Sequence, residues 1–330
     1  MDNFLLSVVF ITYNHEPFLR EALDSVINQK VNFAYEIVVG EDCSTDHTRD
    51  ILVEYKNKYP EKIKLLFREK NFGRPTQNVY ETIMECKGKY LAFLEGDDYY
   101  TDDSKLQQQV DFLEQHSEFI GVTHTCKVVG KAGEDVFDQE ALSLYEWSGV
   151  YTFEDYKNQT KWPGQTATVV CRNIFKEHKY DYSILYKAHD FIDDAVILLF
   201  LLLQGDMYRM DKTMSAWRFV KKEGEGNWNS LKLKRNFMAE ECYTKQKLLM
   251  WCEDNFGLSE YGRQVAAKDF TTALSMLIKK PTKENYTLVK TMYSYNIKHV
   301  VKQDKWATLF TYSIQTIIKE LYKKLKKAGS

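Results

Sequence analysis

The sequence predicts an α/β fold, in which a doubly wound, mostly parallel and Rossmann-like sheet is followed by a helical C-terminal region. Strand-like and helix-like segments alternate over residues 1–120, which is the pattern that parallel strands joined by crossover helices produce. From residue 231 onward the apolar spacing becomes helical. A length of 330 residues with 44% hydrophobic residues supports a sizeable core. We therefore expect one domain over residues 1–230 and a helical region over residues 231–330.

Four short apolar runs predict the first β-strands. They are Leu5–Ile11, Glu36–Gly40, Lys62–Phe67 and Tyr90–Leu94. Helical spacing follows each run, which predicts helices at Pro17–Gln29, 45–59, Thr76–Cys86 and Lys105–His116. Pro17 suits a first helical turn. Ser44 or Thr45 can cap the second helix, and the fourth helix can be capped by Asp103 or Ser104.

The middle of the chain mixes strand and helix signals. Expected strands are Gly121–Val129, Thr166–Arg172, Met207–Met210 and Met214–Phe219. A strongly apolar segment, Asp194–Leu203, predicts a buried helix among them. Beyond residue 231, breaks are expected near Gly257 and Pro281, because glycine and proline interrupt helices, and near Gln303.

Bulk properties exclude several classes of protein. A net charge of −2 gives no broad basic surface of the kind that gathers nucleic acid. The apolar run Phe4–Ile11 follows Asp2 and lacks the basic residues and cleavage site of a secretory signal. The longest apolar stretch, Ala195–Leu203, is too short to cross a bilayer. The six cysteines lack metal-binding spacing, so we expect reduced thiols in a cytoplasmic protein.

A polar cluster follows each of the first four expected strands. The clusters are Thr12–Glu16, Glu41–Ser44, Arg68 with 71–74, and Glu95–Asp98. Ligands of an open parallel sheet bind beyond the carboxyl ends of its strands, so we expect these clusters to meet at one edge. Loops are polar in most proteins, but acids recur here at three of the four positions, where unpaired carboxylates would repel one another.

The last of these clusters has the pattern of a metal site. Glu95 and Asp97 are two residues apart, so on an extended chain their side chains project the same way. Hard oxygen ligands of this kind suit Mn²⁺ or Mg²⁺, which bind one or two carboxylates together with substrate phosphates. Gly96 lets the backbone turn tightly and leaves room for a phosphate. The alternative is a turn with helix-capping acids, a role better assigned to Asp102 and Asp103.

Three segments resemble the bacterial family 2 glycosyltransferases with the GT-A fold. They are VVFITYNHEPFLREALDSVINQ, YEIVVGEDCSTDHT and KGKYLAFLEGDDYY, which occur in the family's order and at about its spacing. The likeness extends over residues 4–220. It implies a GT-A type sheet and an enzyme that uses a UDP-sugar as donor.

The resemblance also implies donor-binding residues. They are Thr12, Tyr13, Asn14 and Glu41 around the uracil and ribose, with Arg74, Glu95, Asp97 and Asp98 completing the donor side. Asp97 would be the metal ligand of the family's DXD motif, with Mn²⁺ or Mg²⁺ as cofactor, and Glu95 replaces the usual first Asp. Relatives usually have Asp at the position of Glu41 and often have Gly at that of Cys43.

A later segment, HDFIDDAVILLFLLLQGDMYRMDKTMSAWRF, resembles the family's acceptor-side helix and the following strand. The resemblance implies that Asp194 is the general base, with Asp193 and Asp190 as alternatives. Asp193 or Asp194 could instead simply cap the helix. Trp162 and Gln165 flank a Pro-Gly turn and are the best candidates for an acceptor loop.

One departure from the family pattern concerns a histidine. Many relatives place a His shortly after the Arg that matches Arg218, where it helps to bind the metal or the diphosphate. This chain has FVKKE at 219–223 instead. Lys221 or Lys222 could neutralise the diphosphate, or 224–226 could form a lid. His15 and His189 are candidate bases, although a lone histidine is more often structural.

The resemblance implies inverting transfer to a hydroxyl of a glycan or lipid-linked acceptor, in bacterial surface polysaccharide synthesis. A dinucleotide oxidoreductase is disfavoured because no G-x-G-x-x-G follows the first strand. A sugar-phosphate nucleotidyltransferase would want a Gly-rich, basic loop there. The remaining alternative is a catalytically silent protein that binds sugar nucleotides or serves as a scaffold on the same fold.

The segment 305–327 carries one apolar stripe and ends in a lysine cluster. The apolar residues are Trp306, Leu309, Phe310, Ile314, Ile317, Ile318, Leu321 and Leu325. An apolar face with tryptophan and lysines is typical of a helix lying on an anionic membrane. A helix packed on the protein's own core fits equally well, and a homodimer contact is a third possibility.

Overall fold

The computed structural model describes residues 4–136, 147–158, 161–191, 194–219, 237–280 and 282–299. The chain divides into two compact units, Met1–Ser230 and Leu231–Ser330. The predicted membrane or dimer segment 305–327 and the candidate base Asp193 lie outside the described residues. Among the helices of the described ranges, none is long and apolar enough to cross a membrane.

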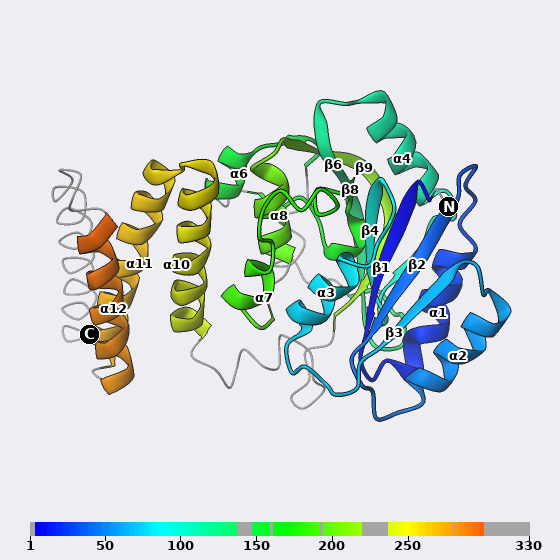
Figure 1. Cartoon of the computed structure of the whole chain (residues 1–330), viewed down its shortest axis with the longest axis horizontal. Helices are drawn as coiled ribbons and strands as arrows, with labels where there is room; N and C mark the ends of the chain where they lie inside the picture. Colours follow the sequence, from blue (N-terminus) through cyan, green and yellow to red (C-terminus); the bar gives the residue numbers. More distant parts are fainter. Residues whose placement is uncertain are drawn as a thin grey trace. The chain divides into compact units, whose positions relative to one another are not determined.

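In the described part of the first unit, nine strands form one sheet (Figure 1). The strands are β1 Leu6–Thr12, β2 Tyr35–Glu41, β3 Ile63–Phe67, β4 Tyr90–Glu95, β5 Tyr99–Tyr100, β6 Phe119–Val129, β7 Gly149–Tyr151, β8 Val170–Arg172 and β9 Asp206–Arg218. Their order is β3-β2-β1-β4-β8-β6-β9-β5, with β7 paired to β9. The run β3-β2-β1-β4 is parallel, and β8 is antiparallel to both of its neighbours.

Helices connect the strands of the first unit and form the described part of the second. In the first unit they are α1 Glu16–Ile27, α2 Thr48–Lys58, α3 Pro75–Ile83, α4 Lys105–Gln115, α6 Phe153–Asn158, α7 Ile184–Ala188 and α8 Asp194–Leu202. In the second unit they are α10 Phe237–Phe256, α11 Ser259–Lys279 and α12 Lys283–His299. As predicted, α10 ends beside Gly257 and α11 ends at Lys279, shortly before Pro281. Pro281 itself and the break predicted near Gln303 lie outside the described residues.

The parallel strands are buried on both faces by helices. On one face Leu6, Val8 and Phe10 join a core that also includes apolar residues of α1, α2 and α4. On the other face α3 packs so closely that a side chain at Gly40 would collide with it. Each fully buried large apolar side chain stabilises the fold by about 1.5–3 kcal/mol. The predicted doubly wound α/β fold is therefore confirmed, and the carboxyl ends of β1, β2 and β4 are held at one edge.

Several local predictions were wrong. The expected strand Thr166–Arg172 begins with a 3₁₀ turn over Thr166–Thr168, and the strand itself covers Val170–Arg172. The two strands expected over 207–219 are one strand, β9, whose pairing with β6 shifts register instead of ending. The gap that was predicted between two strands is therefore an irregularity in the pairing of one continuous strand.

The predicted N-cap of α2 was wrong, and that of α4 was right in position but makes no capping bond. His47 occupies the N-cap of α2, without a side-chain capping bond. The hydroxyl of Ser44 accepts the backbone N–H of Asn14 instead. Ser104 does stand at the N-cap of α4 but likewise makes no side-chain capping bond. In both places the serine hydroxyl that was expected to cap the helix makes another hydrogen bond instead, with Asn14 for Ser44 and with Asp102 for Ser104.

Candidate active site

The carboxyl ends of β1, β2 and β4 bring three of the four predicted clusters together. Thr12 pairs with Glu41 across β1 and β2, and Ile11 pairs with Glu95 across β1 and β4. The loops that follow these strands therefore begin at the same level of the sheet. The predicted meeting of polar clusters at one edge is a consequence of this parallel register.

The loops after β1 and β2 are tied together by side chain–backbone hydrogen bonds. Asn14 donates its N–H to Ser44 Oγ at 2.9 Å, and its own Oδ1 accepts the N–H of Thr45 at 2.7 Å. Asp46 Oδ2 accepts the N–H of Glu16 at 3.1 Å. Asn14 holds a left-handed backbone, with φ of 54°, which asparagine tolerates. Tyr13 is left 42% exposed, so its ring can stack on a flat ligand.

Glu41 lies beneath these loops. Its side chain is completely buried. Its Oε1 accepts the N–H of Ser44 and its Oε2 is paired with the guanidinium of Arg49. Both carboxylate oxygens thus have protein partners, so in this structure Glu41 supports the loop. Its predicted direct contact with the donor nucleoside stays a prediction.

Cys43 also has a left-handed backbone, with φ of 61°. This conformation costs a residue with a side chain about 1–2 kcal/mol, and glycine adopts it without that penalty. The glycine that the family resemblance implies at this position would adopt this backbone without strain.

Replacing Cys43 by glycine is expected to stabilise the protein by up to about 1 kcal/mol, because relief of the left-handed strain exceeds the added flexibility of the unfolded chain. The midpoint of thermal unfolding measures the effect. Cys43→Ala is the matched control, since it also loses the contact of the thiol with the Glu69 carbonyl but keeps the strained backbone. A glycine variant no more stable than the alanine variant would contradict the prediction.

The third cluster is held by Asp42. Its Oδ1 accepts the N–H of Phe72 at 2.9 Å and its Oδ2 accepts the amide of Asn71 at 3.1 Å. Burial raises the pKa of this carboxyl. Arg74, at the end of the same loop, is half exposed and its Nε lies 3.2 Å from Asp190 Oδ1. The structure therefore connects the predicted donor residue Arg74 with the segment that precedes α8.

The E-G-D-D segment makes a tight turn at the end of β4. Gly96 donates its N–H to the Ile11 carbonyl at 2.8 Å. A Cβ at Gly96 would lie 2.7 Å from Thr12 Oγ1 and 2.8 Å from His15 Nδ1, closer than real contacts allow. Glycine is therefore required here by close approach of the first loop. It brings Thr12, His15 and Asp97 to one small space.

Asp97 and Asp98 face different surroundings. Asp98 is buried, and its Oδ1 accepts the backbone N–H of Arg218 at 2.8 Å. Burial and the neighbouring charge of Asp97 raise the pKa of Asp98. Asp97 keeps its side chain 27% exposed. The two acids thus have separate places, with Asp98 holding the end of β9 and Asp97 facing the edge, so the predicted donor contact of Asp98 receives no support from its position.

The side chain of Arg218 holds the turn at Glu95–Asp98 in place. This role was not predicted from the sequence. Its Nε donates to the Asp97 carbonyl at 2.8 Å, and its Nη2 lies 2.9 Å from Glu21 Oε2. Its Nη1 donates to the carbonyls of Gly130 and Lys131. A buried guanidinium with these partners positions the backbone of Asp97. In the sequence, Arg218 could be recognised only as the match of an arginine in the family pattern. That match does not predict which groups its side chain contacts.

The residues at this edge fit a divalent cation. Asp97 Oδ1 is buried and has no hydrogen-bond partner within the described structure, and the same holds for Thr12 Oγ1. An unpaired carboxylate oxygen beside an open edge is suited to a cation ligand. In the described ranges no group of three His, Cys, Asp or Glu side chains could hold a metal by itself. A cation here would complete its shell with oxygens of a bound phosphate.

On the predicted acceptor side, Asp194 is the first residue of α8. Its Oδ1 accepts the N–H of Ala195 at 2.7 Å, so the predicted helix-capping role is present in part. Trp162 and Gln165 lie on the loop before β8. The buried guanidinium of Arg209 holds that loop by donating to the Pro163 carbonyl at 3.1 Å. Arg209 is a supporting residue that the sequence analysis did not identify.

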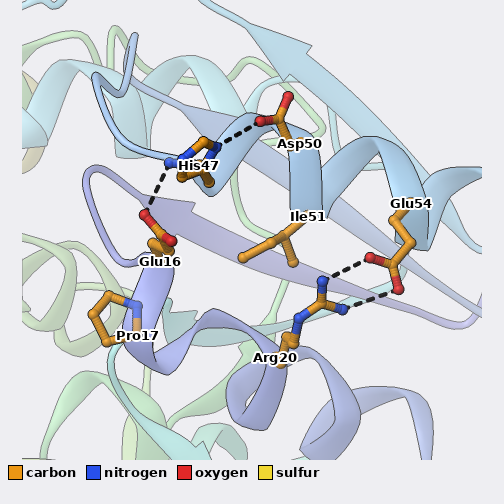
Figure 2. A pocket seen from close by; sticks show the side chains of 7 residues that line it. All are labelled: Glu16, Pro17, Arg20, His47, Asp50, Ile51 and Glu54. Atoms are coloured by element: carbon orange, nitrogen blue, oxygen red, sulfur yellow. Dashed lines mark hydrogen bonds and ion pairs between the residues drawn. The ribbon is translucent and has the colours of Figure 1, made fainter.

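A groove of about 520 Å³ lies between α1 and α2 (Figure 2). Arg20 and Glu54 form a two-pronged ion pair across it, with distances of 2.9 and 2.7 Å. His47 pairs with Asp50 at 3.0 Å, which raises the pKa of His47. Glu16, the last residue of the first predicted cluster, lines this groove, but none of the predicted donor-binding, acceptor-binding or catalytic residues does. Its charged groups are paired with each other, so it is a feature of the outer helices and not the candidate active site.

Comparison with known proteins adds family information to this geometry. A family model described as "Glycosyl transferase family 2" matches residues 7–192. The "Poly(ribitol-phosphate) beta-glucosyltransferase" of Bacillus spizizenii is 38% identical over 67% of this chain and 33% of its own length. "Uncharacterized protein Rv1520" of Mycobacterium tuberculosis is 38% identical over 39% of this chain and 37% of its own. The chain thus spans only about a third of these relatives.

Solved structures agree with the fold. S. aureus TarS 1–349 in complex with UDP-GlcNAc superimposes with a TM-score of 0.65 at 18% identity, covering 97% of this chain and 91% of that one. The same protein in complex with UDP gives a TM-score of 0.63 with the same coverage. At this level of identity the likeness establishes the shared fold.

Proposed function

The chain belongs to glycosyl transferase family 2, and from this premise we propose that it moves a sugar from a UDP-sugar to a hydroxyl of a glycan acceptor, with inversion of the anomeric centre. The main supporting observation is Asp97 Oδ1, which is buried at the edge where the first two loops meet and has no hydrogen-bond partner among the described residues. Solved relatives of the same fold have been crystallised with UDP and UDP-GlcNAc. These facts support a UDP-sugar as donor.

We assign the donor site to the first unit. Tyr13 is exposed at the joined loops and would stack on the uracil, while Asn14 holds both loops in place. Asp97 would hold Mn²⁺ or Mg²⁺ together with the donor diphosphate. When bound, such an ion neutralises charge on the diphosphate and makes UDP a better leaving group. Residues 231–330 would then serve acceptor, oligomer or membrane contacts.

The reaction requires a base on the acceptor side. An acceptor hydroxyl has a pKa far above 7, so it reacts when a carboxylate removes its proton as the bond forms. We assign this role to Asp194. The hydroxyl oxygen bonds to the anomeric carbon, the bond from that carbon to UDP breaks, and the proton passes to the carboxylate. Attack from the face opposite UDP gives inversion.

The acceptor is proposed from the relatives. The Bacillus spizizenii protein is named for transfer to poly(ribitol-phosphate). We propose an acceptor of the same broad class, a bacterial surface glycopolymer or its lipid-linked precursor, at the cytoplasmic face of the membrane. Peripheral contact through residues 305–327 rests on the sequence pattern, and sedimentation with anionic and neutral vesicles measures it.

Thermal stabilisation by nucleotides tests the donor class. UDP or a UDP-sugar at 100 times its dissociation constant should stabilise the protein by about 2.7 kcal/mol, which raises the unfolding midpoint by several degrees. The effect should require Mn²⁺ or Mg²⁺ and should be absent with GDP and CMP. Stabilisation by GDP alone would overturn the UDP assignment. Slow release of UDP from the donor without acceptor distinguishes an enzyme from a silent binding protein.

A further inference from the structure

His15 and Asp97 face each other across the edge of the sheet. His15 Nε2 lies 3.9 Å from Asp97 Oδ1, with side-chain exposures of 24% and 27%. This distance is too long for a hydrogen bond, and Asp97 Oδ1 has no hydrogen-bond partner in the described residues. The imidazole and the carboxylate are therefore close to each other, and within the described residues neither a hydrogen bond between them nor another hydrogen bond occupies this carboxylate oxygen.

Both groups are held in place by backbone contacts. His15 donates its N–H to Thr48 Oγ1 at 3.1 Å, and its carbonyl accepts two N–H groups of the first turn of α1. Arg218 holds the carbonyl of Asp97 at 2.8 Å. Gly96 lets the imidazole approach, because a Cβ there would lie 2.8 Å from His15 Nδ1. The pair is thus pre-positioned by the fold, as a ligand site requires.

We propose that His15 supplies a nitrogen ligand to the divalent cation that Asp97 binds. This inference rests on the proposed function. Bonds from ligands to such ions are about 2.1 Å long, so donor atoms 3.9 Å apart can both contact one ion placed between them. Phosphate oxygens of the donor complete the shell. His15 then takes the place of the histidine that many relatives have after Arg218, since this chain has no histidine between His189 and His299.

The choice of metal follows from the ligand type. Mg²⁺ prefers oxygen ligands and loses its water reluctantly, whereas transition-metal ions accept imidazole more readily. We therefore expect the protein–UDP complex to bind Mn²⁺ in preference to Mg²⁺, and that preference to depend on His15. A water molecule bridging His15 and Asp97 is the alternative occupant of the space.

Electron spin echo envelope modulation of Mn²⁺ bound with UDP tests the proposal directly, because it detects a coordinated imidazole nitrogen. The wild-type complex should show nitrogen modulation. His15→Ala should lose it and bind Mn²⁺ at least about tenfold more weakly, with the unfolding midpoint nearly unchanged because the backbone contacts of residue 15 remain. His47→Ala is the matched control, since His47 lies on the adjacent loop and pairs with Asp50, and it should keep the signal.

Two results would overturn the inference: a wild-type complex without nitrogen modulation, or modulation that survives in His15→Ala. The proposed function has a separate readout. If Mn²⁺ binds with UDP and Asp97→Asn abolishes that binding, but no nitrogen is detected, the metal role of Asp97 stands and only the role of His15 fails. If UDP does not bind, or binds equally well with and without Mn²⁺, the proposed metal-dependent donor site fails first.

Discussion

Asp97→Asn is expected to lower transferase turnover by about 10³-fold or more, with the fold intact. The charge that would hold the cation is lost, and charge neutralisation of this kind contributes several kcal/mol to the transition state. Asparagine has nearly the same shape, and the contact from Arg218 goes to the backbone carbonyl of residue 97, so the turn should persist. The measurements are turnover with a UDP-sugar and calorimetric titration of UDP with and without Mn²⁺.

The control for this substitution is Asp103→Asn. Asp103 is also an aspartate close to the E-G-D-D segment, but it is exposed and paired with Lys30. Its removal should leave turnover unchanged. Equal affinity of the wild-type protein for UDP in the presence and absence of Mn²⁺ would contradict the metal role of Asp97.

Asp194→Asn is expected to reduce kcat by about 10²- to 10⁴-fold, the usual contribution of a general base. The affinity for the UDP-sugar should stay near that of the wild type, because the base acts on the acceptor. Asparagine retains an oxygen that can accept the N–H of Ala195, as Asp194 does now. The start of α8 is therefore preserved, and the loss can be assigned to the missing carboxylate.

Substitution of the neighbouring acids completes this experiment. Asp193→Asn should remain active. Asp190→Asn should weaken the contact with Arg74 without abolishing turnover. An inactive Asp193 variant beside an active Asp194 variant would show that the assignment along the helix is wrong by one residue.

The fold was predictable because its central strands obey a strong rule. Parallel strands buried on both faces give continuous apolar runs, and both ends of β1, β2 and β4 were located within one residue. The short strands β5 and β7 were missed, since runs of two and three residues are too brief for any periodicity. The capping of α2 was mispredicted because Ser44 bonds to Asn14, a residue 30 positions away, which no local pattern reports.

The candidate site was predictable only in part, because the orientation of its side chains depends on contacts between residues far apart in the sequence. Parallel register places the strand ends together, so the meeting of the clusters could be inferred from their order. The order of the clusters did not show which acids face the edge, because that depends on partners far away in the sequence. Glu41 is paired with Arg49, and Asp98 accepts the backbone N–H of Arg218. The supporting roles of Arg218 and Arg209 were invisible for the same reason.

The hydrogen bonds between the loops after β1 and β2 couple the two loops, so that their sequences are expected to change together in evolution. Asn14 bonds to Ser44 and Thr45, and Glu16 bonds to Asp46 and His47. Substitutions at bonded positions of this kind are coupled by about 0.5–3 kcal/mol instead of adding independently. Sequence drift in one loop would therefore be tolerated mainly when the other changes with it. An engineer who wished to transplant this surface to another parallel sheet would have to move residues 13–16 and 44–48 together.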